Sequence, residues 1–114
     1  MNCLLAILCA AAMSGPAESR YDWPAPGSIA VPPPRYAGPL EYEPKVVYDE
    51  QATKTCGKLM KVERSSQIYG CAVLKGRGNC TIIVQSGMPA DLEAAVLLHE
   101  RGHCKGWPPS HPVN

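Results

Sequence analysis

One short segment of the chain combines residues that bind metals with a residue that can move a proton. His99, Glu100 and His103 form the pattern HExxH in a chain with only three histidines. Residues four apart are neighbours on one face of a helix, so both imidazoles can reach one ion. Glu100, rotated by about 100° from His99, can accept a proton from water that bound zinc has made acidic. The pattern predicts a zinc site with Glu100 as general base, unless it is a chance arrangement at a solvated helix end.

A third ligand is needed, because a catalytic zinc usually has three protein ligands and one open position. The remaining histidine, His111, follows His103 by eight residues and stands beyond a Gly-Trp-Pro-Pro turn. We expect His111 to fold back over the helix end and complete the site, although it can also be read as an exposed tail histidine. Three upstream carboxylates are alternatives without a spacing argument: Asp49, Glu50 and Glu63.

A helix over Ala90–Cys104 is expected to position the two histidines. Pro89 suits a first helical turn, and Asp91 and Glu93 favour the positive end of the helix dipole. Gly106 and the two prolines after Trp107 end the helix. Four residues fall at helical spacing along one predicted face: Leu92, Val96, His99 and His103.

A β-hairpin is predicted immediately before this helix. Ile68–Leu74 and Cys80–Gln85 are rich in β-branched or aromatic residues, and the glycines of the intervening Lys75–Asn79 segment permit a tight reversal. Two weaker strand signals lie upstream, at Val46–Tyr48 and at Lys58–Glu63.

The stretch from His99 to His111, HERGHCKGWPPSH, resembles the zinc-binding consensus of the zincin metallopeptidases, and of the metzincin branch in particular. The resemblance covers 13 of the 114 residues. It implies zinc ligation by His99 and His103, a general-base role for Glu100 and a turn at Gly106. The third ligand of the metzincin pattern falls on Pro109, which cannot coordinate a metal, so His111 is a displaced candidate for that role.

Zincins also pair an edge strand beside the active helix with an extended peptide substrate. Thr81–Val84 is the candidate for such β-augmentation, with a plain core strand as the alternative. Tyr48 and Tyr69 are candidates for the donor that stabilises the oxyanion.

The first 17 residues resemble a signal peptide for export. Cys3–Met13 form an apolar run of about 11 residues, close to a signal-peptide core and about half of a membrane span. Cleavage after Ala12, Ser14 or Ala17 would suit the small residues there. Met1-Asn2 supplies no basic residue, so a buried N-terminal helix is the alternative. We expect an exported protein, periplasmic or secreted, without a membrane span in the mature chain.

The rest of the chain divides at the end of a proline-punctuated stretch. Residues 18–44 are expected to be an extended, uncompacted linker that serves as a tether, spacer or short pro-segment. Residues 45–114 then form one small α+β domain, with the hairpin packed against the zinc-binding helix. The chain contains 12 prolines and no phenylalanine, so apolar burial alone is a weak source of stability.

Four cysteines remain once the signal peptide is removed: Cys56, Cys71, Cys80 and Cys104. An even number in an oxidising compartment predicts two disulfides, each contributing about 2–4 kcal/mol. We favour Cys71–Cys80, which would close the hairpin, together with Cys56–Cys104. The chain contains no CxxC pair, which argues against a zinc site made of cysteine ligands.

These features lead to two functional hypotheses. The first is a zinc-dependent hydrolase of peptide or peptide-like amide bonds, acting on a peptide or cell-envelope protein. The second is a non-catalytic zinc-binding accessory module of a cell-envelope or secretion assembly. The near balance of 11 Lys+Arg against 10 Asp+Glu argues against a nucleic-acid partner.

Overall fold

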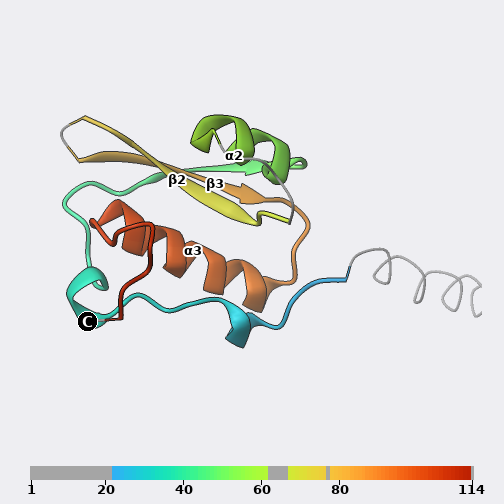
Figure 1. Cartoon of the computed structure of the whole chain (residues 1–114), viewed down its shortest axis with the longest axis horizontal. Helices are drawn as coiled ribbons and strands as arrows, with labels where there is room; N and C mark the ends of the chain where they lie inside the picture. The colour runs from blue at the N-terminus through green and yellow to red at the C-terminus, as the bar shows by residue number, and fades with distance from the viewer. Residues whose placement is uncertain (1–21, 62–66, 77, 114) are drawn as a thin grey trace, which may run out of the picture.

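The chain folds around a three-stranded sheet with one helix on each face (Figure 1). The structure is a computed structural model that describes residues 22–61, 67–76 and 78–113 of the 114-residue chain. Its elements follow in the order η2 (Pro26–Ser28), η3 (Pro34–Tyr36), β1 (Lys45–Asp49), α2 (Ala52–Met60), β2 (Gly70–Lys75), β3 (Asn79–Gln85) and α3 (Ala90–Cys104). This arrangement confirms the predicted α+β class and the packing of the β2–β3 hairpin against the histidine-bearing helix.

The central strand of the sheet is β3. It pairs in parallel with β1 and antiparallel with β2. Ile82 and Val84 of β3 are fully buried on the face that packs against α3, and Ile83 is buried on the opposite face. The suggestion that Thr81–Val84 is an edge strand is therefore wrong, and the alternative of a core strand is confirmed.

The two faces of the sheet bury separate clusters of side chains. Paired residues lie on the same face, and the register places Val47 and Cys71 beside Ile83. These residues pack with α2 on one face. The opposite face packs against α3, with these buried residues: Cys80, Ile82, Val84, Met88, Leu92, Val96 and Cys104. Each helix therefore has a hydrophobic core of its own.

Each helix is also joined to the sheet by a disulfide. Cys56 of α2 is bonded to Cys71 of β2, and Cys104 of α3 is bonded to Cys80 of β3. All four cysteines are oxidised as predicted, but the favoured pairing of Cys71 with Cys80 is wrong. Cys80 lies opposite Leu74, three positions along the strand from Cys71 and on the other face. That separation is about 10 Å, too far for a disulfide.

The two disulfides indicate an oxidising, extracellular environment. Within the residues that the structure describes, no helix has the length and apolar character needed to cross a membrane. The predicted signal peptide, residues 1–17, lies outside the described residues.

Helix α2 occupies a region where the sequence suggested a strand. The predicted strand Lys58–Glu63 is wrong over its first four residues. Lys58–Met60 form the last turn of α2 and Lys61 is its C-cap, while residues 62–66 lie outside the described part. Nine residues make a marginal helix in isolation, so tertiary contacts must hold it. The Thr53 hydroxyl contributes by bonding to the backbone N–H and C=O of Ile68.

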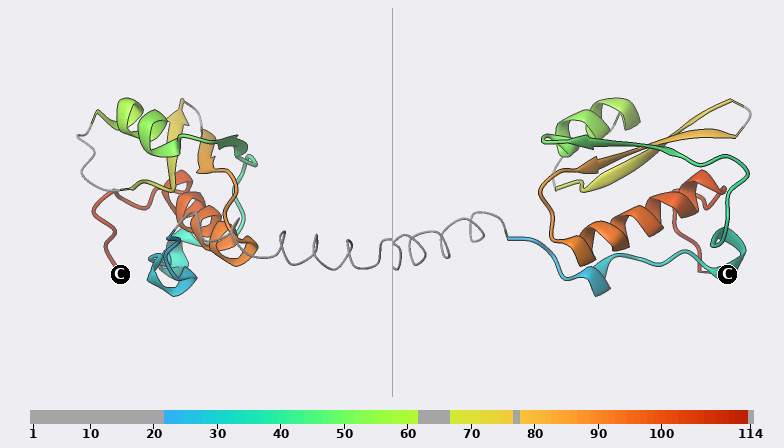
Figure 2. Two further views of the ribbon diagram at one scale, coloured as in Figure 1. Left: turned by 90° about the vertical axis from the view of Figure 1, so that its right-hand side faces the viewer. Right: turned by 180° about the vertical axis from the view of Figure 1, so that it is seen from behind.

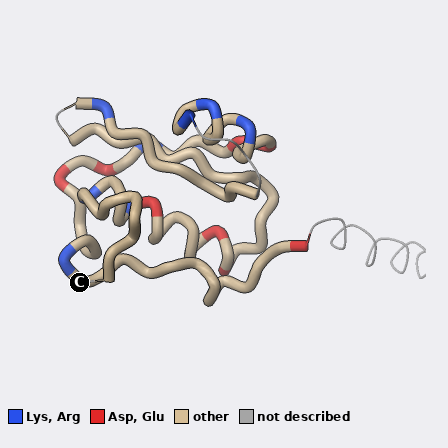
Figure 3. Tube along the Cα trace, in the orientation of Figure 1, with Lys and Arg blue, Asp and Glu red and all other residues tan. Residues whose placement is uncertain are grey.

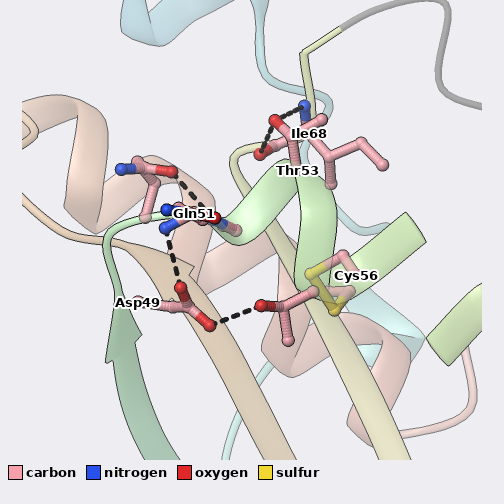
Figure 4. Close-up of a disulfide and its surroundings, with 9 residues drawn as sticks. Asp49, Gln51, Thr53, Cys56 and Ile68 are labelled. Carbon is pink, nitrogen blue, oxygen red and sulfur yellow. Dashed lines mark hydrogen bonds between the residues drawn. A yellow bond between two sulfur atoms is a disulfide. The ribbon is translucent and has the colours of Figure 1, made fainter. Parts of the chain in front are cut away.

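The N-terminus of α2 is held by polar side chains from both neighbouring strands (Figure 4). The Asp49 carboxylate accepts hydrogen bonds from the Thr55 hydroxyl and the Gln51 N–H, at 2.7 Å each. These bonds hold the pKa of Asp49 below its usual value. The Gln85 side-chain oxygen accepts a bond from the Ala52 N–H at 3.1 Å. The free N–H groups of the first turn are thereby partly satisfied.

Helix α3 has the predicted bounds, Ala90–Cys104. Its side chains toward the sheet recur every four residues: Leu92, Val96, Glu100 and Cys104 are all buried. His99 and His103 lie half-buried on the flank of this stripe. The expectation that they share one face with Leu92 and Val96 is therefore met only in part. Gly106, with φ +108°, reverses the chain after the helix.

The proline-rich segment of residues 22–44 runs along the side of α3 that faces away from the sheet (Figure 2). Trp23 and Ile29 pack against the buried cluster that contains Leu92 and Val96. Leu40 packs against the buried cluster that contains Ile82 and Cys104. Pro32 is buried. The segment is extended as expected, apart from two short 3-10 turns, but it belongs to the folded unit and is not a separate linker. Its apolar side chains account for this, because they cover a helix face that would otherwise be exposed to water.

Candidate metal centre

Three histidines converge at the C-terminal end of α3. The distances between their Nε2 atoms are 3.3 Å for His99–His103, 3.0 Å for His103–His111 and 3.2 Å for His99–His111. A tetrahedral ion with metal–nitrogen distances of about 2.0 Å keeps its ligand atoms about 3.3 Å apart. The three imidazoles therefore lie close enough to hold one metal ion, and the predicted fold-back of His111 brings it into the group.

Backbone carbonyls orient the two helical imidazoles. His103 Nδ1 lies 2.7 Å from the Trp107 carbonyl oxygen, and His99 Nδ1 lies 2.9 Å from the Ala30 carbonyl oxygen. A carbonyl can only accept a hydrogen bond, so each Nδ1 must carry the proton. The lone pair of each neutral ring is then on Nε2, the atom that faces the other histidines.

Trp107 forms the floor of the histidine cluster. Its ring stacks on His103 at a centroid distance of 5.0 Å and meets the edges of His99 and His111 at 5.1 and 4.9 Å. The indole is 3 % exposed and donates through Nε1 to the Pro112 carbonyl at 2.8 Å. This bond holds the C-terminal tail against the helix, next to His111.

His111 reaches the cluster through a backbone conformation that is uncommon for a residue with a side chain. Its φ is +59°, in the left-handed region, and its N–H donates to the Pro108 carbonyl at 2.9 Å. Burial, and then the neighbouring His103, lower the pKa of His111. Burial likewise lowers the pKa of His99. Both shifts favour neutral imidazole, the form that binds a metal.

The upstream carboxylates lie away from this cluster. Asp49 is engaged at the N-terminus of α2, and Glu50 borders surface hollows beside Gln51 and Lys54. Glu63 lies outside the described residues. Across residues 22–61, 67–76 and 78–113, the histidine cluster is the one group of three or more metal-binding side chains that lie close together.

Glu100 lies beside the histidines but in a more buried position. It continues the apolar stripe of α3 toward the sheet and is only 5 % exposed. Burial raises the pKa of its carboxyl to about 7. A group with a pKa near the working pH is best suited to take up and release protons. The chemistry expected of Glu100 is thus compatible with its surroundings.

A glycine allows β2 to come close to Glu100. A Cβ atom on Gly70 would lie 2.8 Å from Val96 Cγ1, 3.0 Å from the Ile83 carbonyl oxygen and 3.5 Å from Glu100 Cγ. Any larger residue would push β2 away from α3. Gly70 therefore sets the spacing between the strand and the carboxyl group.

A cleft of about 320 Å³ opens between β2 and the end of α3, and the three histidines and Glu100 line it. Its remaining walls are mainly apolar: Met60, Ala72, Leu74, Trp107 and Pro109. A second hollow of about 240 Å³ shares His99, Glu100 and Gly70 with the first and is bounded by Ser28–Ala30. The candidate site is thus accessible from both sides of Gly70.

Strand β2 has one edge beside this cleft that lacks a partner strand within the described part of the chain. Gln85 N–H donates to the Tyr69 carbonyl at 2.9 Å, and pairs alternate along an antiparallel ladder between bonded and non-bonded. Given the register of β2 with β3, the N–H and C=O groups of Gly70, Ala72 and Leu74 point away from β3. No described strand pairs with this edge.

The two tyrosines suggested as oxyanion donors have different surroundings. The Tyr48 hydroxyl donates to Glu93 at 3.0 Å, near the opposite end of α3 from the histidines. Tyr69 packs near Trp23, with ring centroids 6.0 Å apart, and borders the smaller hollow together with His99 and Glu100. Of the two, Tyr69 is the one near the candidate site.

Three contributors to the site were not predicted: the Ala30 carbonyl, the Trp107 ring and Gly70. Trp107 carries the one usable sequence signal, since a large aromatic residue directly after a helix stop commonly packs back on the helix. Ala30 acts through its backbone, which leaves no mark in the sequence. Comparisons with known protein families, with curated proteins and with solved structures found no match.

Proposed function

We propose that this protein is a zinc-dependent hydrolase of peptide or peptide-like amide bonds. The observation that carries the proposal is the triangle of three Nε2 atoms, 3.0–3.3 Å apart, beside a buried carboxyl group, Glu100, that borders the same cleft. His99, His103 and His111 would hold the ion, and Glu100 would exchange protons in the reaction. The likeness of the HExxH segment to zincin metallopeptidases supports the same assignment.

Zinc is proposed because the donor set suits it. Three neutral imidazoles with one remaining position form a common arrangement of catalytic zinc, whereas carboxylate and carbonyl oxygens suit magnesium or calcium. A zinc ion in this position would acidify a bound water and polarise the carbonyl of an amide. Copper and nickel also bind imidazole, so competition between metals is part of the test.

Glu100 is proposed as the general base because of its place and its pKa. Burial raises the pKa of its carboxyl to about 7, and it shares the cleft with all three histidines. It can take a proton from water and return it to the leaving amine. A purely structural metal site has no need of a carboxyl group there.

An extended peptide is the proposed substrate because of the free edge of β2. The outward backbone groups of Gly70, Ala72 and Leu74 could bind a peptide by β-augmentation, and they border the same cleft as the histidines. This edge replaces Thr81–Val84 as the candidate for substrate binding. The apolar walls of the cleft favour apolar substrate side chains.

The test is chelator-sensitive cleavage of a peptide library by the purified protein, with activity restored by added zinc. Glu100→Gln keeps the shape of the side chain and should lower the cleavage rate by about 100- to 10,000-fold, the usual contribution of general acid–base catalysis. Glu41→Gln, a change at an exposed position, is the matched control and should cleave like the wild type.

The outcome also decides between the two hypotheses. If wild type and Glu100→Gln bind zinc equally and neither cleaves any peptide, the protein is better described as a non-catalytic zinc-binding module. Equal cleavage by both proteins would remove Glu100 from the mechanism.

A further inference from the structure

The proline-rich segment contacts the candidate metal centre at His99 Nδ1, the ring nitrogen that the proposed function does not use. The Ala30 carbonyl oxygen lies 2.9 Å from His99 Nδ1, although the two residues are 69 positions apart in the sequence. Because the carbonyl can only accept, it favours the His99 tautomer with hydrogen on Nδ1. Nε2 is then free toward the other histidines.

A tight contact two residues further on holds Ala30 in this place. Pro32 is buried against Gly102, the residue before His103. A Cβ atom on Gly102 would lie 2.5 Å from Pro32 Cγ, 2.7 Å from Pro32 Cβ and 3.0 Å from Trp107 Cε3. Gly102 therefore permits a close approach between the segment and α3 that no other residue would allow.

The segment is attached to α3 at further points on either side of this contact. Ile29 packs on the cluster around Leu92 and Val96. The Lys105 ammonium donates to the Pro39 carbonyl at 2.7 Å. An ion pair of 2.9 Å joins Arg101 to Glu43, but its exposure makes it a weak contribution. Apolar packing is therefore the main attachment, with Pro32 at its centre.

We propose that residues 28–33 are a positioning segment of the metal centre. They hold the Ala30 carbonyl against His99, select the tautomer of that ring and direct Nε2 toward the ion. The proposal rests on the histidine cluster as a metal site and does not depend on hydrolysis. Removing contacts that orient metal ligands typically lowers metal affinity by about 10- to 100-fold.

Two variants of the full chain displace the segment from opposite sides. Gly102→Ala inserts a methyl group between α3 and Pro32, and alanine is also the better helix former, so helix damage would not explain its effect. The same methyl group would also press on Trp107, so an effect counts for the segment only where Pro32→Gly reproduces it. Pro32→Gly removes the packed ring and leaves α3 unchanged. Pro34→Gly, a change at an exposed proline two residues away, is the control.

Two measurements are made on each protein. Zinc affinity is measured by competition with a chromogenic chelator. Histidine tautomers are measured by long-range ¹H–¹⁵N NMR on zinc-free protein at about pH 8, where ordinary imidazole is neutral. In the wild type and Pro34→Gly, we expect His99 to carry its hydrogen on Nδ1. In Gly102→Ala and Pro32→Gly, we expect mixed tautomers of His99 and zinc affinity lowered by about 10- to 100-fold.

Unchanged zinc affinity in both Gly102→Ala and Pro32→Gly would overturn the proposal. So would lower affinity with the wild-type tautomer of His99, because that pattern would indicate general loosening of the fold. Should Gly102→Ala fail to fold, Pro32→Gly decides alone. If the wild type binds zinc but cleaves no peptide, the hydrolase proposal fails and the positioning role of residues 28–33 is unaffected. If both variants cleave peptides and bind zinc with wild-type affinity, the positioning role fails and the hydrolase proposal is unaffected.

Discussion

The two α-helices in the described part of the chain are attached to the sheet in the same way, but of the two only α3 carries a candidate site. Each is joined to one strand by a disulfide, α2 on one face and α3 on the other. The outer side of α2 is exposed, as at Lys54, Lys58 and Leu59. Figure 3 shows basic residues, in blue, along this helix. The outer side of α3 is covered by residues 22–44.

The difference shows what a candidate metal centre needs beyond its ligands. A helix covered on one side has exposed polar residues that water keeps mobile. A helix covered on both sides can bury a carboxyl group, restrict its imidazoles and orient them through fixed carbonyls. The ring of His99 depends on this second cover, through its contact with the Ala30 carbonyl, whereas Glu100 is buried toward the sheet.

The largest effect is expected from removing ligands on the α3 face. His99→Ala with His103→Ala leaves one histidine of three and should abolish stoichiometric zinc binding. Lys54→Ala with Lys58→Ala, on the outer side of α2, should retain about one zinc per chain. Metal analysis after dialysis measures both. Full zinc occupancy in the double histidine variant would place the metal elsewhere.

The disulfides should affect stability alike and zinc binding differently. Their sequence separations are 15 and 24, so replacing either pair by serine should lower the free energy of unfolding by about 3 kcal/mol. Only loss of Cys80–Cys104 should also weaken zinc binding, because Cys104 adjoins His103. Denaturant titration and chelator competition distinguish these effects. Equal loss of zinc affinity in both variants would argue that the two faces are not independent.

Glu100 should make zinc-free protein less stable as the pH rises. Its folded-state pKa of about 7 lies above the usual carboxyl value, so folding favours the protonated form. Its contribution is complete below about pH 4.5 and is lost as pH rises through 7, on the order of 3 kcal/mol. Glu100→Gln should lack this loss. The measurement is unfolding of both chelator-treated proteins between about pH 5 and 8, with the histidine contributions common to both. Parallel pH profiles would contradict the burial argument.

A smaller effect is expected from widening the gap between β2 and α3. Gly70→Ala places a methyl group 2.8 Å from Val96 Cγ1 and should lower stability by about 1–3 kcal/mol, as overpacking usually does. Gly76→Ala, with open space around its Cβ position, is the control and should change stability little. Thermal unfolding compares them, and equal stability would show that the strand can shift freely.

The local features of the site were predictable from the sequence. Helix α3 has its predicted bounds because proline, acidic first-turn residues and glycine act within a few residues of the helix ends. The spacing of His99 and His103 follows from helix geometry alone. The hairpin was predicted for the same reason, since its β-branched and aromatic residues and its glycine-containing turn are local signals.

Only the tertiary structure decided the contacts between distant segments. The disulfide pairing depends on which helix covers which face, and α2 forms because Cys56, Thr53 and Ala52 find partners in other elements. The cover of α3 by residues 22–44 depends on the fit of Pro32 against Gly102. A proline-rich pattern predicts an extended chain, but its composition does not say which surface that chain will meet. Packing and long-range hydrogen bonds are properties of the whole fold, which is why the contacts of Ala30 and Trp107 with the histidine cluster could be found only in the structure.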